Sequence, residues 1–186
     1  GTLKLNSASD GVTGLALTPR MNWTLATALA NDPDGLLTDL DILAAVALQV
    51  TGQAAIDIGN GALVATVTGV ELNLATMDVT DGTTTLTGAD ILSFTGTASL
   101  FAGVGGSLNG AHTAVVNGTI GFAVNSVSLS LVSATGALTD GANAGDSYVG
   151  VSVALSDAQL IGVSGFELYA SGTLKLNSAS DGVTGL

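Results

Sequence analysis

Residues Gly1 to Leu15, GTLKLNSASDGVTGL, return letter for letter as Gly172 to Leu186, at a spacing of 171 residues (172 minus 1). Fifteen identical residues in a row do not arise by chance. A long exact period is the signature of tandem repeat proteins, whose units contact their neighbours. The sequence therefore predicts one repeat unit over residues 1–171 and the start of the next over residues 172–186. A duplication confined to the two ends would give the same pattern.

The charge of the chain is strongly negative. It has 15 acidic residues against 3 basic ones, for a net charge of −12, and no cysteine. Since nucleic acids and anionic lipids need basic partners, this charge argues against binding either of them. The lack of cysteine excludes disulfides and thiolate zinc sites. No stretch approaches eighteen consecutive apolar residues, so insertion of a helix into a membrane is not expected.

Apolar and polar residues alternate with a period of two through most of the chain, which is typical of β-strands. The longest alternating stretches are residues 15–25, with a turn expected at Pro19, and residues 46–58, 92–100 and 166–176. The thirteen residues of the stretch 46–58 would span roughly 40 Å as a strand. Strands of this length favour an elongated sheet.

Three of the predicted strands carry a glycine at the same phase, namely Gly52, Gly96 and Gly172. A glycine inside a strand indicates a bulge or bend, or a place where a bulky neighbour packs over the gap. The alternation from Phe166 to Leu176 is unbroken and crosses the repeat boundary. The sequence therefore predicts a sheet that continues from one unit into the next.

Asp-Gly and Asn-Gly pairs punctuate the strands, and such pairs accept the positive φ of tight hairpin turns. The pairs begin at Asp10, Asp34, Asn60, Asp81, Asn109, Asn117, Asp140 and Asp181. Residues 38–49 also have helical spacing, so a short helix there remains an alternative. Together these patterns predict an all-β fold: an elongated antiparallel sheet, of the long-stranded β-sandwich or β-solenoid kind, stacked end to end in tandem.

The densest acidic stretch, residues 31–41, is the candidate metal site. Compared with the EF-hand calcium loop, it places Asp32, Asp34, Thr38 and Asp41 at ligand positions, and their oxygens suit Ca²⁺. Position 1 of that loop is Ala30, where a carboxylate is required, and position 12 is Asp in place of Glu. Calcium is therefore the one cofactor that the sequence suggests, with these four residues as its ligands.

Catalytic residues are sparse. His112 is the single histidine, and no Gly-x-Ser-x-Gly turn accompanies it. Glycoside hydrolysis needs two facing carboxylates, but the only glutamates, Glu71 and Glu167, occupy outward positions of predicted strands. The sequence therefore predicts a protein that is not an enzyme.

A binding module for carbohydrate or ice is the alternative function. It would need an exposed row of aromatic or threonine side chains, and Trp23, Tyr148 and Tyr169 are the aromatic candidates. Trp23 shares its phase with Met21 and Leu25, which favours a place in the core for it. The threonines of residues 83–87 do not sustain the alternation of an ice-binding row.

In its composition, its long period and its Asp-Gly-punctuated strands, the chain resembles the tandem extender repeats of giant bacterial cell-surface proteins, including RTX-type adhesins. This resemblance implies export from the cell, an extracellular or cell-surface location and frequent stiffening of repeats by calcium. It also implies that the partners are neighbouring copies of the same repeat, joined end to end. The expected function is structural: a stiff extracellular fibre, stalk or filament.

Overall fold

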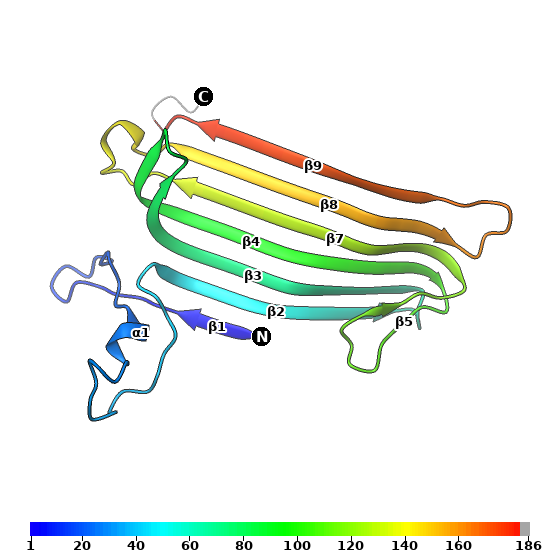
Figure 1. Ribbon diagram of the computed structural model, residues 1–186, viewed down its shortest axis with the longest axis horizontal. Coiled ribbons are helices and arrows are strands. Elements are labelled where there is room, and N and C mark those ends of the chain that lie inside the picture. The colour runs from blue at the N-terminus through cyan, green and yellow to red at the C-terminus, as the bar shows by residue number, and fades with distance from the viewer. Residues whose placement is uncertain (183–186) are drawn as a thin grey trace.

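The computed structural model describes residues 1–182, and most of them belong to one long antiparallel sheet (Figure 1). Its strands are β1 (Thr2–Leu5), β2 (Val46–Ile58), β3 (Leu63–Thr80), β4 (Thr85–Val104), β7 (Ile120–Thr135), β8 (Ser147–Ile161) and β9 (Tyr169–Ser180). A small hairpin consists of β5 (Ser107–Leu108) and β6 (Val115–Val116), and the helical elements are α1 (Trp23–Ala26) and the 3₁₀ turn η1 (Gly141–Asn143). Among the described residues, no helix is long and apolar enough to cross a membrane.

The sheet is an antiparallel meander with the strand order β1-β2-β3-β4-β7-β8-β9. The longest strands have 18 and 20 residues, so they extend over roughly 60 Å. The prediction of an all-β, elongated antiparallel sheet is confirmed. Within residues 1–182 the seven strands lie side by side in a single layer, where the sequence had left open a sandwich or a solenoid (Figure 1).

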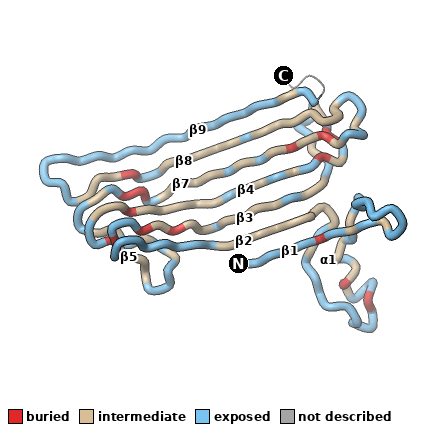
Figure 2. Tube along the Cα trace, turned by 180° about the vertical axis from the view of Figure 1, so that it is seen from behind, coloured by how far each residue is buried: buried red, intermediate tan, exposed pale blue. Residues whose placement is uncertain are grey.

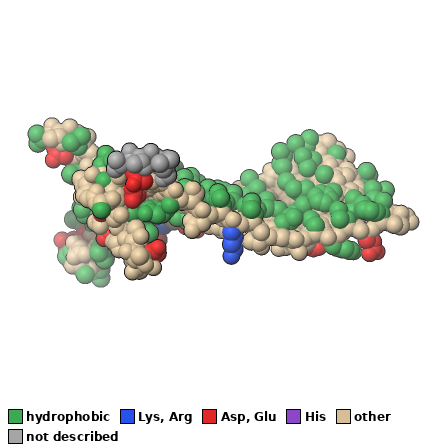
Figure 3. Space-filling view, turned by 90° about the horizontal axis from the view of Figure 1, so that it is seen from above, with side chains coloured by type: hydrophobic (Ala, Val, Ile, Leu, Met, Phe, Trp, Pro, Cys, Tyr) green, Lys and Arg blue, Asp and Glu red, His purple; other side chains and the backbone are tan. Residues whose placement is uncertain are grey.

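The pairing register gives the sheet an apolar face, because directly paired residues point to the same side. One row of paired residues crosses all seven strands and is entirely apolar: Leu3, Val50, Leu72, Phe94, Leu131, Val151 and Leu176. We call the side of the sheet on which this row lies the apolar face. Figure 3 shows hydrophobic side chains gathered along one side of the sheet, while a basic side chain projects from the other.

The opposite side, which we call the polar face, carries a matching row shifted by one residue. Its members are Thr2, Thr51, Glu71, Thr95, Ser130, Ser152 and Lys175. Side-chain hydrogen bonds link this face across strands: Gln49 Nε2 donates to Glu71 Oε1 over 3.2 Å, and Asn73 Nδ2 donates to Ser93 Oγ over 3.3 Å. The alternation in the sequence thus separates the two faces of one layer.

A line of β-bulges crosses the sheet beside the glycines that predicted them. Gly52 and Gly172 lie next to register shifts of the neighbouring strands. The bulged residues themselves include Gly69 and Asp157, whose φ values are 59° and 54°. Gly96 lies opposite the register shift between Thr68 and Glu71 of β3. The predicted association of these glycines with bulges is therefore confirmed, whereas a side chain at Gly96 would meet the Phe94 ring only at an ordinary contact distance of 3.6 Å.

Full burial is confined mainly to two small clusters near the ends of the strands (Figure 2). Under the β5–β6 hairpin, Val64, Phe101 and Ala123 occupy one paired row and are fully buried. The second cluster consists of the buried residues Leu86, Ala89 and Ala134. The partly buried residues Val79, Ile91 and Tyr148 pack against it. Between these clusters the sheet is open on both faces.

The predicted strand over residues 15–25 is wrong. Ser9 and Ala16 form one isolated β-bridge, and the short helix α1 begins at Trp23. The Asn22 side chain accepts the amide of Leu25 over 3.1 Å and caps that helix. Because this cap satisfies a free amide of the first turn, it favours a helical turn over an extended chain.

Two further segments differ in length from the patterns that predicted them. Within residues 38–49 no helix forms, and the strand alternative prevails from Val46. The last strand begins at Tyr169, so Phe166 and Leu168 precede it. The turn between β8 and β9 contains Gly162 and Gly165 with φ values of 73° and 77°, and these interrupt the extended backbone.

Candidate functional site

The predicted calcium loop is organised by its own backbone. Asp32 is buried, and its two carboxylate oxygens accept the amides of Leu36 and Leu37 over 3.1 and 2.7 Å. Asp34 and Thr38 are exposed. A carboxylate that accepts two backbone amides closes a turn in the way of an extended Asx turn.

Asp41, the fourth predicted ligand, is paired with Lys4. Its Oδ2 forms an ion pair of 3.0 Å with Lys4 Nζ, and its Oδ1 accepts the Thr24 hydroxyl over 3.4 Å. The hydrogen bond from Lys4 and the charge of that ammonium hold the pKa of Asp41 below its ordinary value. In residues 1–182 no three acidic or histidine side chains gather in a way that could hold a metal ion. Calcium binding therefore stays a prediction.

The catalytic candidates lie apart. His112 sits in the turn of the β5–β6 hairpin, where its amide donates to the Asn109 carbonyl over 2.9 Å. Glu71 belongs to the hydrogen-bonded polar face of β3, whereas Glu167 lies in the turn before β9, outside the strand in which the sequence placed it. The two carboxylates therefore do not face one another across a cleft.

The aromatic candidates do not form one surface. The Trp23 indole is half-buried beside β1, where its N–H donates to Asn6 Oδ1 over 3.2 Å. Tyr148 packs against the Leu86 cluster, and Tyr169 is exposed near the other end of the sheet. A bound sugar ring could therefore stack on only one of these three aromatic side chains.

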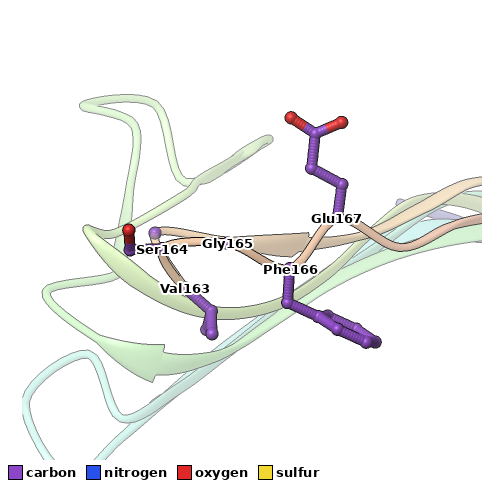
Figure 4. Close-up of a pocket in the computed structure, with 6 residues that line it drawn as sticks. Val163, Ser164, Gly165, Phe166 and Glu167 are labelled. Atoms are coloured by element: carbon purple, nitrogen blue, oxygen red, sulfur yellow. The ribbon is translucent and has the colours of Figure 1, made fainter.

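A shallow hollow of about 590 Å³ lies inside the turn from Gly162 to Glu167. In Figure 4, Val163 and Phe166 point to one side of this turn and Glu167 to the opposite side. Since all of its walls belong to one turn and its polar and apolar groups diverge, the hollow has no converging functional groups.

The two copies of the repeated segment form the two edges of the sheet. In the first copy, Thr2–Leu5 is strand β1 and pairs with β2, from Thr2 opposite Thr51 to Leu5 opposite Leu48. In the second copy, the same four letters lie within β9 and pair with β8, from Thr173 opposite Ala154 to Leu176 opposite Val151. In an antiparallel meander of seven strands, the first and the last run in the same direction.

The backbone groups that each copy leaves unpaired are the ones that the other copy uses. In the first copy, Asn6 donates its amide to Ala47, so Asn6, Lys4 and Thr2 turn their N–H groups toward β2. On the other edge, Leu160 of β8 donates its amide to the Leu168 carbonyl.

The same alternation can be followed along β9. The register shift lies on β8, which has two residues opposite one of β9, so Gly172, Leu174 and Leu176 continue to turn toward β8. Thr173, Lys175 and Asn177, the counterparts of Thr2, Lys4 and Asn6, therefore turn outward. One strand of this sequence can pair with a β8 on one side and a β2 on the other.

The chain matches no family model, no curated protein and no solved structure.

Acid is expected to destabilise the fold through its turn aspartates. Backbone amides of Thr13 and Val12 lower the pKa of Asp10, amides of Thr84 and Thr83 lower that of Asp81, and Lys4 lowers that of Asp41. A carboxyl whose pKa is lower in the folded state adds stability above its unfolded value of 3.8, and loses it as the pH falls through the folded value.

The melting temperature should therefore be level above about pH 5 and fall below about pH 4. Thermal unfolding followed by circular dichroism would measure this. The double variant with Asp10→Asn and Asp81→Asn should show a smaller acid drop than the wild type. An equal drop in the two proteins would contradict this assignment.

Proposed function

We propose that this chain is a non-catalytic structural repeat of a secreted or cell-surface protein, and that tandem copies build an extracellular fibre, stalk or filament. The observation that supports this proposal is the complementary pairing of the two edge strands, which are copies of one sequence. In a tandem array, a single segment would be β9 of one unit and β1 of the next. The sheet would then continue through every boundary without a hinge, and each edge would be covered.

This arrangement fixes the geometry of the array. Seven strands with one shared leave six per unit, and at about 4.8 Å between strands the array would lengthen by about 29 Å per unit. The strands would lie across the long axis. The pair Lys4–Asp41 would recur at each boundary and tie the shared strand to the loop before β2.

A chain of two units tests the proposal. It consists of residues 1–171 twice, followed by residues 172–186, so that the middle copy of the segment has to serve both units. The matched control has its own copy for each unit, with a flexible Gly-Ser linker between them. Small-angle X-ray scattering should find the shared-strand chain about 29 Å longer, across its strands, than a single unit. In thermal unfolding, the shared-strand chain should melt in one transition.

The control should behave as two independent bodies. If the shared-strand chain also scatters as two bodies on a flexible joint, the continuous sheet is excluded and the fibre proposal loses its support. The alternative of a carbohydrate- or ice-binding module has no such support: the row that crosses the polar face mixes threonine and serine with Glu71 and Lys175.

A further inference from the structure

The apolar face is wide, continuous and uncovered in residues 1–182. At its two edges, Leu3, Leu174 and Leu176 are 71%, 67% and 56% exposed. Monomeric proteins rarely expose apolar patches above a few hundred Å². A face of this kind indicates an interaction surface.

The face carries no charge over its central part. On β1, β2 and β9 its positions are Leu3 and Leu5, then every second residue from Leu48 to Ile58, then Leu174 and Leu176, and all are apolar or glycine. The charged side chains Lys4 of β1, Glu71 of β3 and Lys175 of β9 lie on the polar face. Because an unpaired charge is costly to bury, a partner for this face must itself be apolar there.

The folded unit also buries too little for its length. Eight hydrophobic residues are buried among residues 1–182, in small groups near the strand ends. A chain of about 150 residues normally removes about two thirds of its surface from water on folding, and a sheet with one apolar side needs a second layer against it. The described sheet therefore supplies only one of the two layers that such a core needs.

The dimensions of the face suit a stable interface. Without the four residues of β1, six strands at about 4.8 Å and ten residues at about 3.3 Å give a footprint of roughly 950 Å². Stable protein interfaces bury about 800 Å² on each partner. The face is therefore large enough to hold two chains together without other contacts.

We propose that the apolar face binds the apolar face of a second copy of this chain, so that two sheets stack about 10 Å apart with their strands nearly aligned. A second copy meets the requirement that the partner surface be apolar, because its own face is also uncharged. A lipid surface is disfavoured as the occupant: the net charge of −12 repels anionic headgroups, and the row across the face has no Trp, Tyr or Lys to anchor in an interface. This inference concerns the face and does not depend on the edge pairing proposed above.

Two neighbouring residues of β7 provide a matched test on the full 186-residue chain. Leu131 is central on the apolar face, and Ser130 is central on the polar face. Analytical ultracentrifugation over a concentration series should find a dimer for the wild type and for Ser130→Glu. Leu131→Glu should dissociate at least about 100-fold more readily, because two new carboxylates would be buried in the interface.

The milder variant Leu131→Thr, which keeps a strand-forming residue, should weaken the dimer in the same direction, and far-UV circular dichroism should confirm that every variant is folded. A wild type that is monomeric throughout would overturn the proposal. So would a dimer that Leu131→Glu and Leu131→Thr leave intact, since the chains would then be joined elsewhere. Flotation of the wild type, but not of Leu131→Glu, with phosphatidylcholine vesicles would assign the face to lipid and equally overturn it.

Discussion

Chains that end at Ser171 are expected to assemble head to tail into long polymers. Removing residues 172–186 takes away β9 from Gly172 onward and keeps only its first three residues. Most of the outer edge of β8 then has no partner. The first fifteen residues of another copy have the sequence of the missing strand. Their outward backbone groups, those of Leu3 and Leu5, correspond to the groups of Leu174 and Leu176 that pair with β8.

Because each copy would donate β1 at one edge and accept at the other, the contact is heterologous and does not close on itself. Negative-stain electron microscopy and sedimentation velocity would detect the polymers. In the full chain both places are filled by its own two copies, so polymers of this register should not form. We therefore expect a change from discrete particles to filaments on removing a segment that contains no part of the two buried clusters.

A synthetic peptide with the sequence of residues 1–15 should block this growth by occupying the edge of β8. The control peptide has Leu3→Pro and Leu5→Pro, which removes the two N–H groups that face β8, and it should not block. Folded, monomeric chains after the truncation would contradict the complementary edges. A truncated chain that polymerises regardless of the first peptide would show another mode of association.

Phe101→Ala is expected to cause a severe loss of stability. Phe101 is fully buried between Val64 and Ala123, and a side chain at Gly106 would come within 2.5 Å of its ring, so the β5–β6 hairpin lies directly on it. Removing a buried phenylalanine side chain costs about 3–5 kcal/mol through lost burial and the cavity that remains.

Urea unfolding followed by circular dichroism would measure this loss. Phe166→Ala is the control, since that ring is 55% exposed, and its effect should stay within about 0.5 kcal/mol. A loss below about 1 kcal/mol for Phe101→Ala would mean that the hairpin collapses into the space, and that the small cluster does not hold the hairpin in place.

Local pattern predicted the central strands well because one physical requirement, an apolar side and a polar side, governs each residue of them. The alternation over residues 46–58 gives the bounds of β2. The Asp-Gly pair at Asp81 gives the turn between β3 and β4, where the carboxylate accepts the amides of Thr83 and Thr84. These signals lie within a few residues of the structure that they specify.

The repeated segment shows where local pattern stops being sufficient. Its two copies are identical, yet the first forms a four-residue strand and the second lies in a twelve-residue strand. The copy in β9 faces β8 as far as Ser180, whereas the first copy leaves β2 after Asn6, whose amide still bonds to Ala47 while its side chain bonds to Met21 and Trp23. Distant neighbours determine the difference, and no local window contains them.

The candidate sites divide in the same way. The sequence identified the repeat boundary as the informative place and predicted that a sheet crosses it. That the first copy takes the opposite edge could not be read from the sequence, because it depends on pairing with β2 some forty residues away. The acidic loop suggested a metal site from residue types alone, while the bonds of Asp32 and Asp41 to amides and to Lys4 arise only from the folded chain.

The order of strands in the sheet has a mechanical consequence for an array joined through shared strands. Tension along such an array would act across the strands, so their hydrogen bonds would open one after another like a zipper instead of resisting together. One unit of 171 residues could then lengthen from about 29 Å to about 560 Å at about 3.3 Å per residue. The array would absorb a sudden load by releasing one strand at a time. When the force falls, each released strand could pair again with the strand that had been its neighbour.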